Sequence, residues 1–289
     1  MCAEDDFEEF AARASDVTRR GFTAMALGAG VLASFPGLGA SADTAGADVD
    51  IKTADGTADA YFVHPATGRH PGVLIWPDIF GLRPAFKAMA TRLAASGYAV
   101  LVVNPFYRTQ RAPTAPEHPD FSDPPTRAAL MALAGSLTPQ TVAVDAAAFI
   151  AYLDSQPSVD TRRRIGTTGY CMGGPLVFRT AAAAPARVGA AATFHGGGLV
   201  TDQPDSPHRL IPSTKAHFLI AIAENDDQRE PDAKTVLRKA FSDNQRPADI
   251  EVYAGTQHGW CPTDSRVYHH DQAEKAWSRL LALLKASLT

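Results

Sequence analysis

The stretch Gly169-Tyr170-Cys171-Met172-Gly173-Gly174 sets a cysteine among glycines at the junction of two expected elements. An apolar, β-prone run, 164–168, comes before it, and an alanine-rich helical pattern, 175–184, follows. A strand, an abrupt turn and a helix form the arrangement in which a strained turn exposes a reactive side chain at the end of a sheet. Glycine suits that turn because it tolerates unusual backbone angles and lets a strand and a helix pass closely. We therefore expect Cys171 to be a nucleophile; the alternative is a cysteine that serves only packing.

From Asp43 onward, short β-prone runs alternate with helical patterns. The expected strands are 58–64, 72–76, 98–103, 165–168, 189–194, 216–223 and 250–253, and the expected helices are 84–96, 139–154, 175–184, 231–241 and 271–285. The proline-rich segment 110–125 is expected to be an irregular surface excursion near the site. Alternation of this kind predicts an α/β fold with a mostly parallel twisted sheet and helices on both faces. Ligands of such sheets bind outside the carboxyl ends of the strands, so the loops that follow the strands should converge there.

Two of those loops supply an acid and a base. Asp226 and Asp227 follow one expected strand, and His258 follows the next. His258 can take the proton of a thiol, and a carboxylate can then orient the imidazole and stabilise its charged form. Asp226 is the expected carboxylate and Asp227 is the alternative. Taken singly, these residues are typical of a surface loop or a turn. Together with Cys171 they follow the chain order nucleophile, acid, base of the α/β-hydrolases.

A negatively charged oxygen develops when a nucleophile attacks a carbonyl group, and two backbone N–H groups usually stabilise it. One donor is expected to be Met172, directly after the nucleophile. The other should come from the loop after the strand 72–76. Pro77 has no N–H group, so Ile79 is the expected donor.

The motifs together resemble the dienelactone hydrolase family of α/β-hydrolases. They are G-Y-C-M-G-G at 169–174, D-I-F-G at 78–81, N-P-F-Y at 104–107 and H-G-W at 258–260. The similarity runs from about Ala58 to Leu284. It implies a Cys-His-Asp triad that acts on a small carboxylic ester or lactone through a thioester acyl-enzyme, with no metal or cofactor.

The resemblance also bears on the substrate. In the best-known member a glutamate in the turn after the third strand holds the resting thiol, and Asp78, one methylene shorter, stands in that turn here. That member holds a substrate carboxylate with two arginines. Arg108, or alternatively Arg111, could match one of them. The second has no counterpart, since 259–262 reads Gly-Trp-Cys-Pro. A substrate other than dienelactone is therefore expected.

Aromatic residues near these loops are expected to line the pocket wall. They are Trp76, Phe80 and Trp260. Aromatic side chains dominate the apolar walls of small-molecule sites. We therefore expect Phe80 and Trp260, with Asp78 and Arg108, to bind the substrate. His195, at the end of another expected strand, is interpreted as structural.

The first 42 residues read as a targeting segment. Arg19 and Arg20 precede an uncharged apolar run, 23–38, which leads to a small-residue cleavage site at 40–42. This order is that of a signal peptide, and the paired arginines resemble the twin-arginine export signal. We expect a signal peptide at 1–42, a single hydrolase domain at 43–289, a periplasmic location and no stable membrane association after cleavage. The alternative is an interfacial N-terminal helix on a cytoplasmic protein.

Composition excludes several other classes. The chain has 289 residues, a net charge of -4 and 3 cysteines. This slightly negative charge is not that of a nucleic-acid-binding domain, which is typically basic. The cysteine count excludes a disulfide framework or a paired zinc site. A thiol redox protein using Cys171 and Cys261 would need a C-x-x-C motif that the chain lacks. The remaining alternative to an enzyme is a catalytically silent hydrolase fold that binds a ligand. The oligomeric state is not fixed by the sequence.

Overall fold

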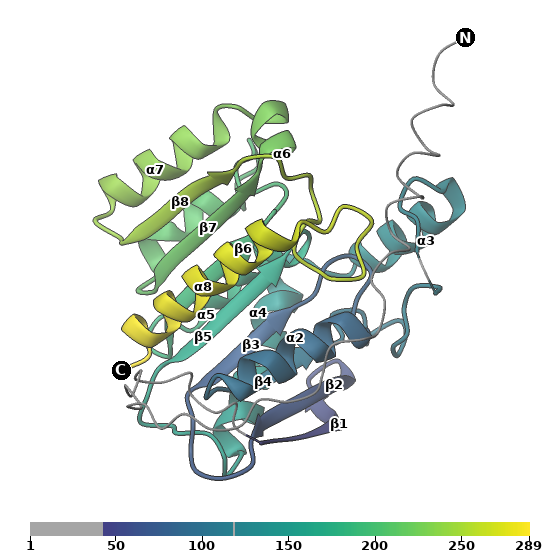
Figure 1. Ribbon diagram of the computed structural model, residues 1–289, viewed down its shortest axis with the longest axis vertical. Helices are drawn as coiled ribbons and strands as arrows, with labels where there is room; N and C mark the ends of the chain where they lie inside the picture. The colour runs from purple at the N-terminus through teal and green to yellow at the C-terminus, as the bar shows by residue number, and fades with distance from the viewer. Residues whose placement is uncertain (1–42, 118) are drawn as a thin grey trace, which may run out of the picture. The chain divides into compact units, whose positions relative to one another are not determined.

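Eight strands form one sheet in the computed structural model, which describes residues 43–117 and 119–289 (Figure 1). The strands lie in the order β1-β2-β4-β3-β5-β6-β7-β8. Their bounds are β1 Thr44–Thr53, β2 Gly56–Pro65, β3 Gly72–Trp76, β4 Ala99–Val103, β5 Ile165–Tyr170, β6 Val188–Phe194, β7 His217–Ala223 and β8 Ala248–Tyr253. The strands from β4 to β8 pair in parallel, and β2 and β1 add antiparallel pairs at one edge. The predicted mostly parallel α/β sheet is confirmed.

The burial of each strand follows from its place in the sheet. Every residue of β3, β4, β5 and β6 is buried, as expected for strands covered on both faces. The edge strand β1 is mostly exposed, and Ile51 is its one buried residue. Because β1 has so little apolar periodicity, the sequence did not predict it. It is held by its antiparallel pairing with β2, through a turn at Gly56 with a φ of 143°.

Helices cover both faces of the sheet. The main helices are α2 Pro84–Ala95, α3 Pro124–Ala134, α4 Pro139–Ser155, α5 Gly173–Ala183, α6 Glu224–Arg229, α7 Ala233–Asp243 and α8 His270–Ser287, with a 3-10 turn η1 at Pro207–Ser213. Apolar side chains of α2 and α8 pack into one core cluster, and those of α4, α5 and α7 pack into another. In Figure 1, α2 and α8 lie in front of the sheet. This two-sided cover leaves the carboxyl ends of the strands free for a site.

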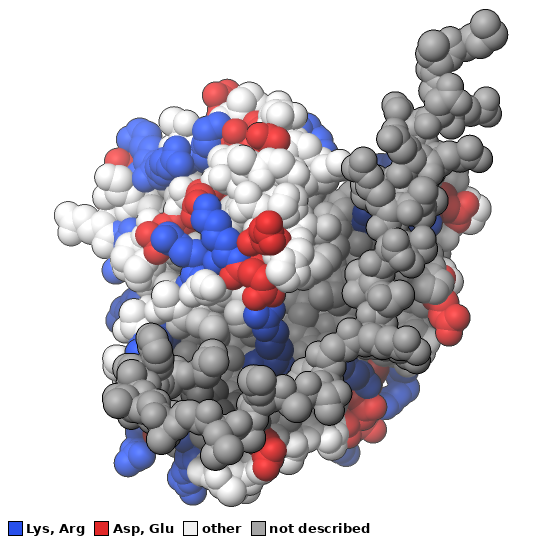
Figure 2. All heavy atoms as spheres, viewed as in Figure 1, with Lys and Arg blue, Asp and Glu red and all other residues white. Residues whose placement is uncertain are grey.

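The face that carries α2 and α8 shows acidic and basic side chains interspersed (Figure 2). One pair joins the two helices, because Arg92 of α2 lies 2.5 Å from Glu274 of α8. The guanidinium of Arg92 also lies 4.4 Å from the ring centroid of Trp277. Exposed pairs of this kind stabilise little, so the apolar clusters carry the helix packing.

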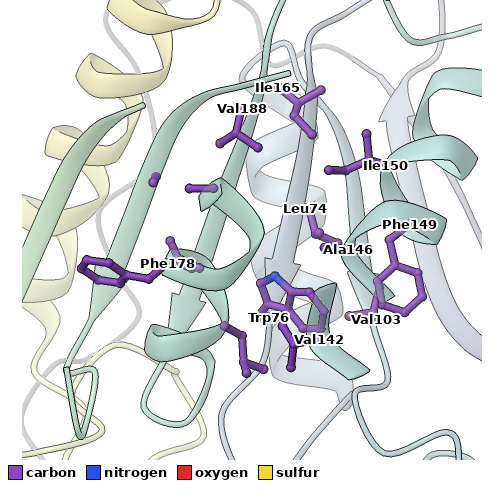
Figure 3. Close-up of a cluster of buried hydrophobic side chains, with 14 of the residues drawn as sticks. Leu74, Trp76, Val103, Val142, Ala146, Phe149, Ile150, Ile165, Phe178 and Val188 are labelled. Carbon is purple, nitrogen blue, oxygen red and sulfur yellow. The ribbon is translucent and has the colours of Figure 1, made fainter. Parts of the chain in front are cut away.

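Trp76 belongs to the core. It is fully buried at the end of β3, 5.6 Å from the ring of Phe149 on α4 (Figure 3). Its indole Nε1 donates to Thr180 Oγ1 at 3.0 Å, which satisfies its polar atom. The expectation that Trp76 lines the pocket is therefore wrong. The large indole instead fills the space between β3, α4 and α5.

Two helices differ from the sequence expectation. The segment 110–125 is irregular for most of its length, but Pro124 and Pro125 open helix α3, with Asp123 accepting the N–H of Thr126 at 3.0 Å. Proline fits the first helical turn because its missing N–H would have no partner there. The short helix α6 starts directly after β7, at residues for which a loop was expected.

The predicted signal peptide, 1–42, lies outside the described residues. Within the described residues, no helix combines the length and the apolar character needed to cross a membrane.

Candidate active site

The turn after β5 has the geometry that its glycines predict. Cys171 has a φ of 52°, a strained value for a residue with a side chain, and its thiol is half-buried. A Cβ on Gly169 would lie 2.2 Å from the carbonyl oxygen of Gly173, and one on Gly173 would lie 2.4 Å from that of Trp76. Only glycine permits such close backbone contacts. The turn therefore presents Cys171 at the carboxyl end of the sheet, directly before α5.

The structure places Asp226, rather than Asp227, on His258. Asp226 Oδ2 lies 2.7 Å from His258 Nδ1. The backbone N–H of His258 donates to Asn225 Oδ1 at 2.8 Å. Asp227 instead pairs with Lys234: its two carboxylate oxygens accept from Lys234 Nζ at 2.6 and 2.7 Å. Because α6 begins directly after β7, its first turn carries the acid to the loop that follows β8.

His258 is held in an environment that favours its charged form. Burial is the largest single effect and opposes protonation. The hydrogen bond to Asp226, the contact with Cys171 and the charges of both together raise the pKa of His258 to about 10. The thiol and the imidazole are thus close enough to interact. No aligned hydrogen bond joins their side chains within the described residues.

Cys171 and His258 open into one cavity of about 380 Å³. Its walls come mainly from the loop after β3, the segment before α3 and the loop before α8. The lining residues are Asp78, Ile79, Phe80, Arg83, Pro119, Asp120, Phe121, Cys171, His195, His258, Gly259, Asp264, Ser265 and Arg266. Asp78, Ile79 and Phe80 thus lie where the sequence placed them. Within residues 43–117 and 119–289, no group of three or more histidine, cysteine, aspartate or glutamate side chains is arranged to hold a metal ion.

Two predicted substrate-binding residues lie elsewhere. Arg108 binds Asp145 at 2.7 Å and Asp55 at 2.6 Å, and it is not among the residues that line the cavity. Asp145 is fully buried, and a buried carboxylate without a paired cation would be strongly destabilising. Trp260 is fully buried and stacks on Tyr253 at 4.7 Å. Both expectations of substrate contact are corrected: Arg108 neutralises a buried carboxylate, and Trp260 belongs to the core behind the site. The alternative arginine, Arg111, pairs with Asp50 on the surface.

Of the cavity residues that the sequence did not predict, two bear directly on the charges of the site. Arg83 binds Asp78 and Asp264 together, and a tertiary ion network of this kind has no sequence signal. His195, interpreted as structural, lies with its ring centroid 5.1 Å from that of His258. It is buried with a φ of 41°, and neither ring nitrogen has a hydrogen-bond partner among the described residues. Burial and the charge of His258 lower the pKa of His195 well below its usual range, so this second imidazole is neutral.

Comparison with known proteins identifies the family. The family model of the dienelactone hydrolases matches residues 58–288. The chain belongs to the dienelactone hydrolase family. Membership makes it an enzyme of the α/β-hydrolase fold, from a family of ester and lactone hydrolases.

Relatives of this dienelactone hydrolase family member span nearly its whole described length. The carboxymethylenebutenolidase of Pseudomonas sp. (strain P51) is 26% identical over 242 residues, covering 84% of this chain and 95% of the relative. The crystal structure of a dienelactone hydrolase-like promiscuous phosphotriesterase from metagenomic libraries superposes with a TM-score of 0.71 at 19% identity, covering 85% and 99% of the two chains. The dienelactone hydrolase of Anabaena variabilis gives a TM-score of 0.59 at 15% identity, with the same coverage. The structural likenesses show the shared fold.

Proposed function

We propose that the protein hydrolyses a carboxylic ester or lactone by nucleophilic attack of the Cys171 sulfur. The supporting observation is that Cys171 and His258 share one cavity, with Asp226 hydrogen-bonded to Nδ1 of the imidazole. These three residues come from the ends of three different strands, β5, β7 and β8. A nucleophile, a base and an orienting carboxylate in this order have the roles needed for acyl transfer.

In the first step, His258 takes the thiol proton and the sulfur attacks the carbonyl carbon. Despite the opposing effect of burial, the contacts of His258 with Asp226 and Cys171 raise its pKa to about 10, so the ring can hold the thiol proton. The bond between the carbonyl carbon and the leaving oxygen then breaks. His258 returns the proton to that oxygen, which leaves as an alcohol or, from a lactone, stays attached to the acyl chain. The product of this step is a thioester on Cys171.

The oxyanion of this step would lie between the backbone N–H groups of Ile79 and Met172. Ile79 lines the cavity, and Met172 directly precedes α5. The close contact between Gly173 and the end of β3 brings the two loops together. Neither N–H group has an intramolecular partner among the described residues, so both are free to donate. Donors fixed before the reaction cost no reorganisation when charge develops.

In the second step, a water molecule attacks the thioester while His258 takes one of its protons. The bond between carbon and sulfur breaks, and the proton passes to the sulfur. The carboxylic acid leaves and the free thiol is restored. Asp226 keeps the imidazole in the tautomer that both steps need.

The test is a rapid-mixing assay with p-nitrophenyl butyrate. A burst of nitrophenolate equal to the enzyme concentration should precede steady turnover, because nitrophenolate is a good leaving group and acylation should therefore be faster than the separate deacylation step. Cys171→Ala should abolish both the burst and the turnover. His258→Ala should reduce turnover by at least about 100-fold, the scale at which a general base contributes. Cys171→Ser should keep the fold, as measured by circular dichroism, and lose most of the activity.

The alternative is a catalytically silent fold that binds a ligand. Absence of both burst and turnover on any short ester, in a folded sample, would favour it. Turnover that survives Cys171→Ala would contradict the assignment of the nucleophile.

A further inference from the structure

The charge that lines the cavity points to a class of substrate. Among the described residues, five charged side chains other than His258 line it. They are Asp78, Asp120 and Asp264, which are acidic, and Arg83 and Arg266, which are basic. Carboxylates thus outnumber guanidiniums around the thiol.

Arg83 is the more buried of the two arginines, and it is fully engaged. Two of its donors bind the Asp78 carboxylate, at 2.6 and 2.9 Å. Two more bind the Asp264 carboxylate, at 2.7 and 3.1 Å. The fifth donor reaches the carbonyl oxygen of Gly81 at 3.4 Å. A guanidinium has five N–H donors, so Arg83 has none left for a substrate.

The packing around Arg83 holds it in this position. Its side chain is only 12% exposed, and its guanidinium lies 4.8 Å from the ring centroid of Phe86 and 5.5 Å from that of Phe80. Movement toward a ligand would leave the Asp78 carboxylate, which is 8% exposed, without its cation. Leaving one member of a buried pair uncompensated is costly.

Arg266 is poorly suited to bind a substrate carboxylate in place of Arg83. Its Nη1 donates to Asp120 at 2.8 Å, and its side chain is 71% exposed. An exposed guanidinium is well hydrated and screened by salt, so its attraction for an anion is weak. Among the described arginine and lysine side chains that line the cavity, none is both buried and free to bind a carboxylate.

We propose that the cavity selects esters or lactones with an uncharged acyl group and discriminates against acyl groups that carry a carboxylate. The proposal rests on the function proposed above. Ile79, Phe80, Pro119 and Phe121 provide apolar wall for such a group. An added carboxylate would meet three acidic side chains and no free guanidinium, and like charges brought together without compensation suppress the wrong partner.

The experiment compares two esters of equal chain length and identical leaving group, p-nitrophenyl butyrate and mono-p-nitrophenyl succinate. At low ionic strength, kcat/KM for the succinate ester should be at least roughly tenfold lower, and the gap should narrow with added salt. Asp264→Asn removes one carboxylate and frees donors of Arg83, so the ratio should shift several-fold toward the succinate ester. Asp243→Asn, which alters a surface pair with Lys239 on α7, is the matched control and should leave the ratio unchanged.

Equal or faster turnover of the succinate ester, or a ratio that Asp264→Asn does not move, would overturn the proposal. A second readout separates it from the proposed function. Butyranilide and succinanilate are matched amides, and their binding to Cys171→Ala can be measured by calorimetry without any turnover. The uncharged anilide should bind more tightly. Tighter binding of succinanilate would overturn the charge preference, even if the protein hydrolyses neither ester. If butyranilide binds more tightly but neither ester is hydrolysed, only the proposed hydrolase function is contradicted.

Discussion

At the residue scale, the charge of His258 depends on Asp226. Asp226→Asn removes the carboxylate, so the pKa of His258 should fall from about 10 toward the ordinary value of roughly 6.5. By analogy with other triads, kcat should fall by up to roughly 10⁴-fold, because the amide can hold the wrong tautomer. The measurement is kcat/KM for p-nitrophenyl butyrate across pH. Asp227→Asn is the matched control, since Asp227 contacts Lys234, and a larger loss there would contradict the assignment of the acid.

The same shift predicts how stability depends on pH. A histidine whose pKa is raised by folding stabilises the protein most below its unfolded pKa, roughly 6.5, and this contribution disappears as pH rises through about 10. His195 has the opposite effect on stability. Because folding lowers its pKa, it destabilises the folded protein as pH falls below the pKa of this histidine in the unfolded chain. The wild type should therefore be compared with His258→Gln by urea denaturation at pH 6 and pH 10. Any stability advantage of the wild type should be larger at pH 6, and a larger advantage at pH 10 would contradict the sign.

At the element scale, the first turn of α6 fixes the loop that carries His258, the proposed base. Glu224 Oε2 accepts the N–H of Gly255 at 3.2 Å, and Asn225 Oδ1 accepts that of His258 at 2.8 Å. Asn225→Ala should lower kcat by roughly tenfold with little change in KM, because a misplaced base affects the transition state rather than substrate binding. Asn225→Asp keeps the acceptor oxygen and should restore much of kcat. Asn244→Ala, which removes a bond to Ala240 on α7, is the control, and an equal loss of kcat there would contradict a positioning role.

The nucleophile turn offers a second test at this scale. Gly173→Ala would bring a Cβ within 2.4 Å of the carbonyl oxygen of Trp76, so the backbone must shift. Overpacking of this kind costs about 1–3 kcal/mol. Gly197→Ala is the matched control, because no atom lies within 4 Å of its added Cβ. Urea denaturation should show a loss of stability for Gly173→Ala alone, and equal effects would contradict the tight crossing.

The elements also show what the sequence can and cannot predict. Strands buried on both faces are continuous apolar runs, so β3 and β4 were found within a residue of their bounds, whereas the exposed β1 has no such signal. The turn around Cys171 follows from local glycine chemistry. The choice between Asp226 and Asp227 depends on the helical rotation of α6, which the residues did not reveal. Ion networks such as that of Arg83 join segments distant in sequence and need the folded chain.

At the scale of the whole molecule, we propose that the first 42 residues export the protein to the periplasm. The basis is the paired Arg19 and Arg20 ahead of an uncharged apolar run. Replacing both arginines by lysine should retain the precursor in the cytoplasm, as measured by fractionation and the size of the chain. An unchanged distribution would contradict a twin-arginine route, and a precursor that is never shortened would contradict a cleaved signal.

The proposed nucleophile and the proposed base are unequally anchored in the sheet. Cys171 follows β5, which has a strand on each side, whereas His258 follows β8, the terminal strand. Openings that expose peripheral segments cost less free energy than melting of the interior. On mild heating, His258 should therefore leave its position while Cys171 stays in place. Hydrolytic activity should be lost several degrees below the temperature at which circular dichroism records the loss of helices. Activity should return on cooling, because only the edge strand and the loop after it would have unfolded.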